Sequence, residues 1–323
     1  MQDRVIGKPP TIEQLADANS AILKSLGGLD REGLQAFMEG REKSSVLEKT
    51  VDKLACYPRE QFISKVGYPE DYKGPRPIRE QIMTLAERFN LDPSGALQAM
   101  HDAGPKHKHA EGWFAAVNWK VLGRNYMKQC WKVFDWIREY SMRPSDNIQH
   151  EGKEYGMFSF SHVGGFSDSQ IGFHPSYNTW RLYHPQDKHD PIWIFPAQFG
   201  LGRAGQSHRR AVELCKRTKS EYPLSIFEVA CMIALHPERL GIGFYEQLWA
   251  IAPGSVEIAK PDAFNTQGLD DRYFSFHGDK AKTVNGYNRH CCFGSNTGWG
   301  GSHWGPVTAW KWENQAWQEK QKK

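Results

Sequence analysis

The spacing of apolar residues changes near the middle of the chain, and this change limits the folds that the chain can adopt. Before residue 142, apolar side chains recur with helical spacing. After the polar, proline-containing segment 142–146, glycine, histidine and aromatic residues become more frequent, and apolar residues tend to alternate as they do in strands. We therefore predict an α+β protein: an all-α domain over 1–143, an α+β domain with a mainly antiparallel sheet over 144–317, and a solvated tail over 318–323.

The first half contains clear helix signals. Ile78, Ile82, Leu85 and Phe89 fall on one face of a helix over 77–90. Asp92 has the place of an N-cap before Pro93, and Gly104-Pro105 ends the helix that follows. The sequence predicts helices over 11–26, 77–90, 93–103 and 110–140, the last of them long and rich in aromatic residues.

The second half mixes both spacings. Alternating apolar residues predict strands over 154–161, 179–184, 191–195, 272–276 and 308–312. Helical spacing returns over 207–216 and 224–235. The segment 224–235 is apolar nearly all round, so we expect its helix to be buried.

Charge and cysteine usage exclude several classes of protein. The formal net charge is only +4, and the second helix of a helix-turn-helix-like segment over 85–100 has no Lys or Arg, so nucleic acid is not an expected partner. No apolar run is long enough to cross a membrane, and the first ten residues contain no apolar signal segment. The six cysteines are scattered without a C-x-x-C pair, which favours reduced thiols in the cytoplasm. No cofactor or metal pattern is recognisable, and we predict neither.

A glycine-rich turn with several arginines is the strongest candidate for a binding site. Gly200, Gly202 and Gly205 have the G-x-G-x-x-G spacing between a predicted strand and a predicted helix. The surrounding segments do not form a parallel βαβ unit, so a dinucleotide site is not favoured. Backbone amides at such a helix start hold anions, and arginines add positive charge. The residues expected to hold the ligand here are Arg203, Ser207, Arg209 and Arg210.

Tryptophans near the C-terminus supply a second candidate surface. Trp299 and Trp304 are interleaved with glycine and polar residues, as in platforms that stack on sugars or bases. The alternative is a pair of loops that covers an edge of the core. Together with the arginine-rich turn, these residues predict that the second domain binds a small polar or anionic ligand, or a glycan, without chemistry of its own.

Two other classes of protein stay open. His162, Asp168 and His174 lie in a tract rich in His and Asp over 162–190, and such side chains exchange protons near neutral pH. They are the catalytic candidates if the protein is a hydrolase, acting on a glycan for example, although turn and surface positions explain the same residues. Cys292 with His277 or His303 is a weaker candidate for a thiolate nucleophile. A third class is a structural protein that self-associates through aromatic surfaces.

Overall fold

The computed structural model describes most of the chain after residue 60. The described residues are 61–141, 148–150, 153–155, 158–159, 171–173, 175–182, 184–218, 220–239, 247–257, 272–283, 286–296 and 302–312. Residues 62–323 belong to one compact unit, which is considered by itself below. The helix predicted over 11–26 and the tail predicted over 318–323 lie outside the described residues.

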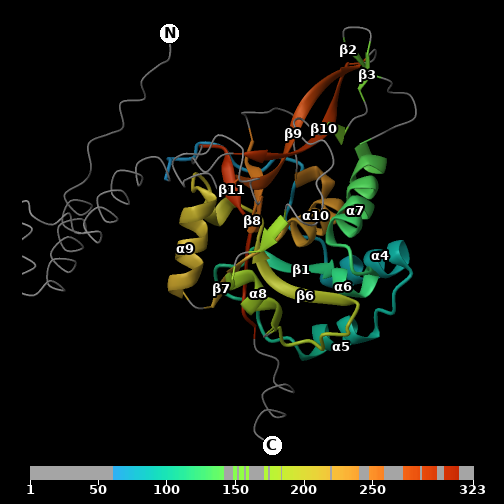
Figure 1. The fold of residues 1–323 in the computed structure, drawn as a ribbon, viewed down its shortest axis with the longest axis vertical. Helices are drawn as coiled ribbons and strands as arrows, with labels where there is room; N and C mark the ends of the chain where they lie inside the picture. Colours follow the sequence, from blue (N-terminus) through green and yellow to red (C-terminus); the bar gives the residue numbers. More distant parts are fainter. Residues whose placement is uncertain are drawn as a thin grey trace, which may run out of the picture. The chain divides into compact units, whose positions relative to one another are not determined.

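Seven α-helices and twelve strands lie within the described part of the chain (Figure 1). The helices are α4 (Ile78–Phe89), α5 (Ser94–Asp102), α6 (Trp119–Leu122), α7 (Tyr126–Ser141), α8 (Pro175–Leu182), α9 (His208–Thr218) and α10 (Ile226–Leu235). The strands are β1 (Gly112–Val117), β2 (Ile148–His150), β3 (Lys153–Tyr155), β4 (Phe158–Ser159), β5 (Ile171–Phe173), β6 (Ile192–Gln198), β7 (Glu221–Pro223), β8 (Trp249–Glu257), β9 (Arg272–Thr283), β10 (Gly286–Asn296), β11 (Trp304–Pro306) and β12 (Thr308–Trp310). Two short 3-10 turns, η2 (Leu201–Arg203) and η3 (Pro237–Arg239), complete the set.

A four-stranded sheet has the order β1-β6-β12-β7, and each pair of neighbouring strands in it is antiparallel. β1 and β6 pair along their length, from Gly112 opposite Ala197 to Val117 opposite Ile192. β6 is buried at every position, as expected for the strand predicted over 191–195. This pairing joins segments from both sides of residues 142–146 in one sheet.

A larger sheet has the order β11-β8-β9-β10-β4, with β5 also paired to β8. β8, β9 and β10 are antiparallel, whereas the short strands β11 and β4 run parallel to their neighbours. β9 and β10 form a long hairpin that extends away from the helices (Figure 1). The prediction of an α+β protein with mainly antiparallel sheets is confirmed.

Helix α10 lies at the centre of the core. All ten of its residues are buried, which confirms the prediction for 224–235. It packs against α7, β1 and β8, so it touches both large sheets. Phe114 of β1 and Val133 of α7 belong to the same hydrophobic cluster as Phe227 and Ile233 of α10. Residues before and after Pro144 therefore contribute to one core.

Two predicted elements are wrong. The helix expected over 110–140 begins only at Tyr126, because residues 112–117 form β1. The apolar run over 112–117 is short, and a short apolar run fits a buried strand as well as a buried helix. Further along, Gly123 has a φ of 147° and separates the short helix α6 from α7. Residues 179–182 of the strand expected over 179–184 belong instead to helix α8, where Tyr177 and Trp180 lie on the same buried face. The helices predicted over 77–90 and 207–216 are confirmed as α4 and α9.

Two buried histidines are held neutral in the folded protein. The ring of His184 stacks on Trp193 with 4.3 Å between centroids, and burial lowers the His184 pKa to about 3. His236 donates from Nδ1 to the carbonyl of Met232 at 2.8 Å and accepts from the amide of Arg76 at Nε2 at 3.0 Å. Burial lowers the pKa of His236 to about 4. The core therefore disfavours the protonated form of both rings.

The folded protein should lose stability as the pH falls from 6.5 to 5.0. In this window the unfolded chain protonates both histidines while the fold keeps them neutral, so the unfolded state binds more protons. Each histidine should cost about 2 kcal/mol of unfolding free energy across the window. Urea denaturation at pH 7.0, 6.0 and 5.0 measures the loss, and His236→Gln should reduce the slope. A stability that stays flat to pH 5.0 would contradict the prediction.

Candidate functional site

One hollow in the described residues contains Arg203, a residue predicted to bind the ligand. Four segments contribute: the loop between α5 and β1, the turn after β6, the connection from α9 to β7, and β12. The cavity has a volume of about 550 Å³. We call it the Lys108 pocket; its lining residues are His107, Lys108, His109, Gln198, Gly202, Arg203, Thr218, Ser220, Glu221 and Trp310.

The floor of the Lys108 pocket is a buried ion pair. Arg203 donates from Nε to Oε1 of Glu221 at 3.0 Å and from Nη2 to the other carboxylate oxygen. The Glu221 side chain is only 1% exposed, and the Thr308 hydroxyl also donates to it. The Arg203 side chain is 17% exposed, and its Nη1 group donates to no described residue. The pair is therefore neutral overall and keeps one guanidinium nitrogen available at the pocket.

The wall of the Lys108 pocket is the sequence His107-Lys108-His109. The His107 ring stacks on Trp310 with 5.0 Å between centroids and 11° between planes, and its centroid lies 5.5 Å from that of His109. The amide of His109 donates to Nδ1 of His107 at 3.3 Å. Burial, and then the neighbouring His109 and Lys108, lower the pKa of His107, while Glu221 opposes the shift. Lys108 and His109 are exposed, so this wall presents a cation and two imidazoles to solvent.

The glycine-rich turn itself offers no amide to an anion. The amides of Gly200 and Gly202 donate to Oε1 of Gln198 at 2.7 and 3.1 Å, and that of Leu201 donates to the Tyr68 hydroxyl at 3.0 Å. The four amides over 203–206 donate to backbone carbonyls. Because every amide of 200–206 already has an acceptor, the turn differs from a phosphate-binding loop.

The glycines of this turn are required for packing. Gly200 and Gly205 have φ values of 116° and 81°, which L side chains rarely adopt. A Cβ atom on Gly205 would lie 2.0 Å from the carbonyl oxygen of Phe62. Below the turn, the fully buried Arg239 donates to the carbonyls of Phe199 and Leu248 and so fixes the chain at both places. The G-x-G-x-x-G spacing thus reflects close backbone contacts.

The other residues predicted to bind the ligand do not line this hollow. Ser207 is fully buried, and its hydroxyl accepts the amide of Arg210 at 3.0 Å, as an N-cap of α9 does. Arg209 and Arg210 are half-buried in the first turn of that helix. Trp304 is 8% exposed and packs with Trp249 and Ile251, which leaves little of its ring for stacking on a ligand. Trp299 lies outside the described residues.

The catalytic candidates His162, Asp168 and His174 also lie outside the described residues. The described end of their tract is a turn, in which the amide of His189 donates to the Asp187 carboxylate at 2.7 Å and the amide of Asp190 donates to the carbonyl of Asp187 at 3.0 Å. Turn positions thus explain Asp187, His189 and Asp190. On the hairpin, the register places Cys292 opposite His277 on neighbouring strands.

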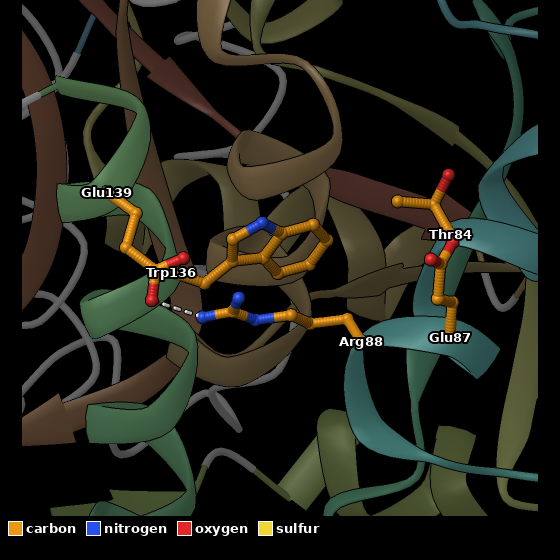
Figure 2. Close-up of a pocket in the computed structure, with 5 residues that line it drawn as sticks. All are labelled: Thr84, Glu87, Arg88, Trp136 and Glu139. Carbon is orange, nitrogen blue, oxygen red and sulfur yellow. Dashed lines mark hydrogen bonds and ion pairs between the residues drawn. The ribbon is translucent and has the colours of Figure 1, made fainter. Parts of the chain in front are cut away.

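A second hollow, of about 490 Å³, lies between α4 and α7 (Figure 2). Arg88 reaches across it from α4 to Glu139 on α7 at 2.5 Å, and its guanidinium lies 5.7 Å from the ring centroid of Trp136. Thr84 and Glu87 lie on the α4 side. The cation of this hollow already has both a carboxylate and an aromatic ring as partners, so the Lys108 pocket is the better candidate site.

The described residues contain neither a metal-ligand cluster nor a membrane-spanning helix. No group of three or more His, Cys, Asp or Glu side chains there is arranged to hold a metal ion. Among the helices described, none has the length and apolar character needed to cross a membrane. Cys130 and Cys231 carry reduced thiols with no exposed surface, and burial raises the pKa of Cys231.

Comparison with known proteins identified no match: no family model, curated protein or solved structure is significantly similar to the chain. Any proposal about function therefore depends on the geometry of the site.

Removing Arg203 should destabilise the fold because it leaves Glu221 buried without its cation. Arg203→Ala should cost about 3 kcal/mol of unfolding free energy, measured by urea denaturation. The control Arg217→Ala removes an exposed partner of Glu213 and should cost less than about 0.5 kcal/mol. In a double-mutant cycle, Glu221→Gln should recover part of the Arg203→Ala loss. Strict additivity of the two changes would contradict the pairing.

Replacing Gly205 should be costly for a different reason. Gly205→Ala adds a left-handed backbone penalty and a clash with Phe62, together about 3 kcal/mol. Gly104→Ala is the matched control, since a Cβ atom there meets no atom within 4 Å. Thermal and urea denaturation of both variants test the difference, and equal stabilities would show that the turn accommodates a Cβ atom at residue 205.

Proposed function

We propose that the protein binds a small polar or anionic ligand in the Lys108 pocket, without chemistry of its own. The observation that supports this most directly is the balance of charged groups in the lining. Lys108 has no carboxylate partner among the described residues, Arg203 keeps one guanidinium nitrogen available, and the only carboxylate of the lining, Glu221, is neutralised by Arg203. An anionic group at this position gains favourable interactions and meets no unpaired negative charge.

The rim of the pocket formed by Thr218 and Ser220 suits neutral polar groups of a ligand. The hydroxyl of Ser220 donates to the carbonyl of Thr218 at 3.2 Å, and the hydroxyl of Thr218 donates to the carbonyl of Cys215 at 3.2 Å. Each hydroxyl proton already takes part in a hydrogen bond within the protein, whereas the oxygen lone pairs can accept a hydrogen bond from a ligand. A hydroxylated molecule with an anionic group suits both the charged and the hydroxyl-bearing residues of the lining, and the volume of about 550 Å³ is in the range of small-molecule sites.

Binding is favoured over catalysis because the lining contains no nucleophile positioned beside a base. Nδ1 of His107 accepts the amide of His109, and the ring is stacked on Trp310. Both hydroxyls of the rim donate to backbone carbonyls and not to an imidazole. General-base activation needs a hydrogen bond from the nucleophile to the base.

Lys108→Ala should weaken ligand binding and leave the fold intact, because Lys108 is exposed and its side chain makes no described hydrogen bond. A panel of sugars, carboxylates, phosphates and sulfates would be screened by thermal shift and by tryptophan fluorescence, since Trp310 lies in the lining. For an anionic ligand, the affinity should fall about tenfold on loss of this charge.

Lys188→Ala is the matched control for that experiment, since Lys188 is equally exposed and lies outside the pocket. The proposal predicts unchanged affinity for this variant. If every compound of the panel binds Lys108→Ala and the native protein equally, or if none binds the native protein, the proposed function is wrong.

A further inference from the structure

The charge of the Lys108 pocket depends on two imidazoles. Arg203 and Glu221 offset each other, so with both imidazoles neutral the lining carries one net positive charge, that of Lys108. With His107 and His109 protonated it carries three. A dianion is therefore matched only when at least one imidazole gains a proton.

On this basis we infer that the ligand carries a tetrahedral dianionic group, a phosphate or a sulfate, and that its binding is coupled to proton uptake by His107. The inference rests on the proposed function and specifies its ligand class. The cavity is larger than an inorganic anion requires, so the dianion is one part of a larger polar molecule.

The surroundings of His107 explain why the proton arrives with the ligand. In the free pocket, burial against Trp310 and the proximity of Lys108 and His109 lower the His107 pKa. Arg203 adds positive charge at the floor, and Glu221 is the only carboxylate that opposes these groups. An anion bound between the wall and the floor reverses the sign of the local field and so favours the protonated form of His107.

The arrangement of donors favours a tetrahedral oxyanion over a carboxylate. Lys108 and the two imidazoles come from one loop and Arg203 comes from the turn after β6, so donors from two separate segments line one hollow. A planar carboxylate has two oxygens in one plane, whereas a phosphate or sulfate group presents at least three acceptor oxygens in different directions.

Calorimetric titration of the full chain with sulfate at pH 6.0 and pH 8.0 tests the coupling. Sulfate keeps the same charge over this range, so any change of affinity comes from the protein. Uptake of one proton should make binding about tenfold tighter at pH 6.0 than at pH 8.0. Titrations in two buffers with different ionisation enthalpies should give different heats, because the bound proton is taken from the buffer. A titration with inorganic phosphate at pH 8.0 compares the affinity for phosphate with the affinity for sulfate.

Variants separate the roles of the wall residues. His107→Gln removes the imidazole that takes up the proton and should abolish most of the difference between pH 6.0 and pH 8.0. Lys108→Gln should weaken sulfate binding at both pH values, with binding still tighter at pH 6.0 than at pH 8.0. His189→Gln is the control, since His189 is exposed and lies outside the pocket, and it should change neither value.

Three outcomes would overturn the inference. Sulfate binding with the same affinity at both pH values and no buffer-dependent heat excludes the proton coupling. Binding of a sugar or a monocarboxylate in the pocket, with neither sulfate nor phosphate bound, excludes the oxyanion class and leaves the proposed function standing. Failure of the whole panel to bind removes both proposals.

Discussion

The burial of helix α10 is the constraint on which the rest of the described structure depends. A ten-residue helix that is apolar nearly all round must be covered on every side. α7, β1 and β8 provide that cover, and they come from segments far apart in the chain. Both large sheets are thereby fixed around one element. The position of β6 and β12, which lead to the Lys108 pocket, follows from that of β1, because these strands share its sheet.

A single carboxylate on this helix orients the neighbouring helices. Glu228, 2% exposed, accepts the hydroxyl of Tyr177 at 2.8 Å and lies 3.4 Å from Arg181, so α8 is held against α10. The hydroxyl of Ser225 also donates to Glu228 and is hydrogen-bonded to that of Tyr126 on α7. Apolar surfaces alone allow helices to rotate and slide, whereas a buried carboxylate requires these particular partners.

The Lys108 pocket lies at the edge of this framework, where secondary structure gives way to loops. Its lining combines one turn held by Gln198 and Tyr68 with a loop whose histidine rests on Trp310. Rigid strands thus position side chains of otherwise irregular segments, which is how binding sites are commonly built. The ion pair of Arg203 and Glu221 fixes the floor, and the exposed Lys108 supplies the uncompensated charge.

The sequence by itself determined the α+β class, the buried helix over 224–235, and the elements that became α4, α9 and β6, because their periodicity and end signals are local. It also identified Arg203 as a residue of interest. Only the tertiary structure decided that 112–117 is a strand, since a short apolar run becomes a strand when a partner such as β6 is present. Likewise, no local pattern shows that the amides over 200–206 are already used, or that Lys108 and Arg203 face one hollow. Those facts depend on pairing between residues distant in sequence, which spacing along the chain does not encode.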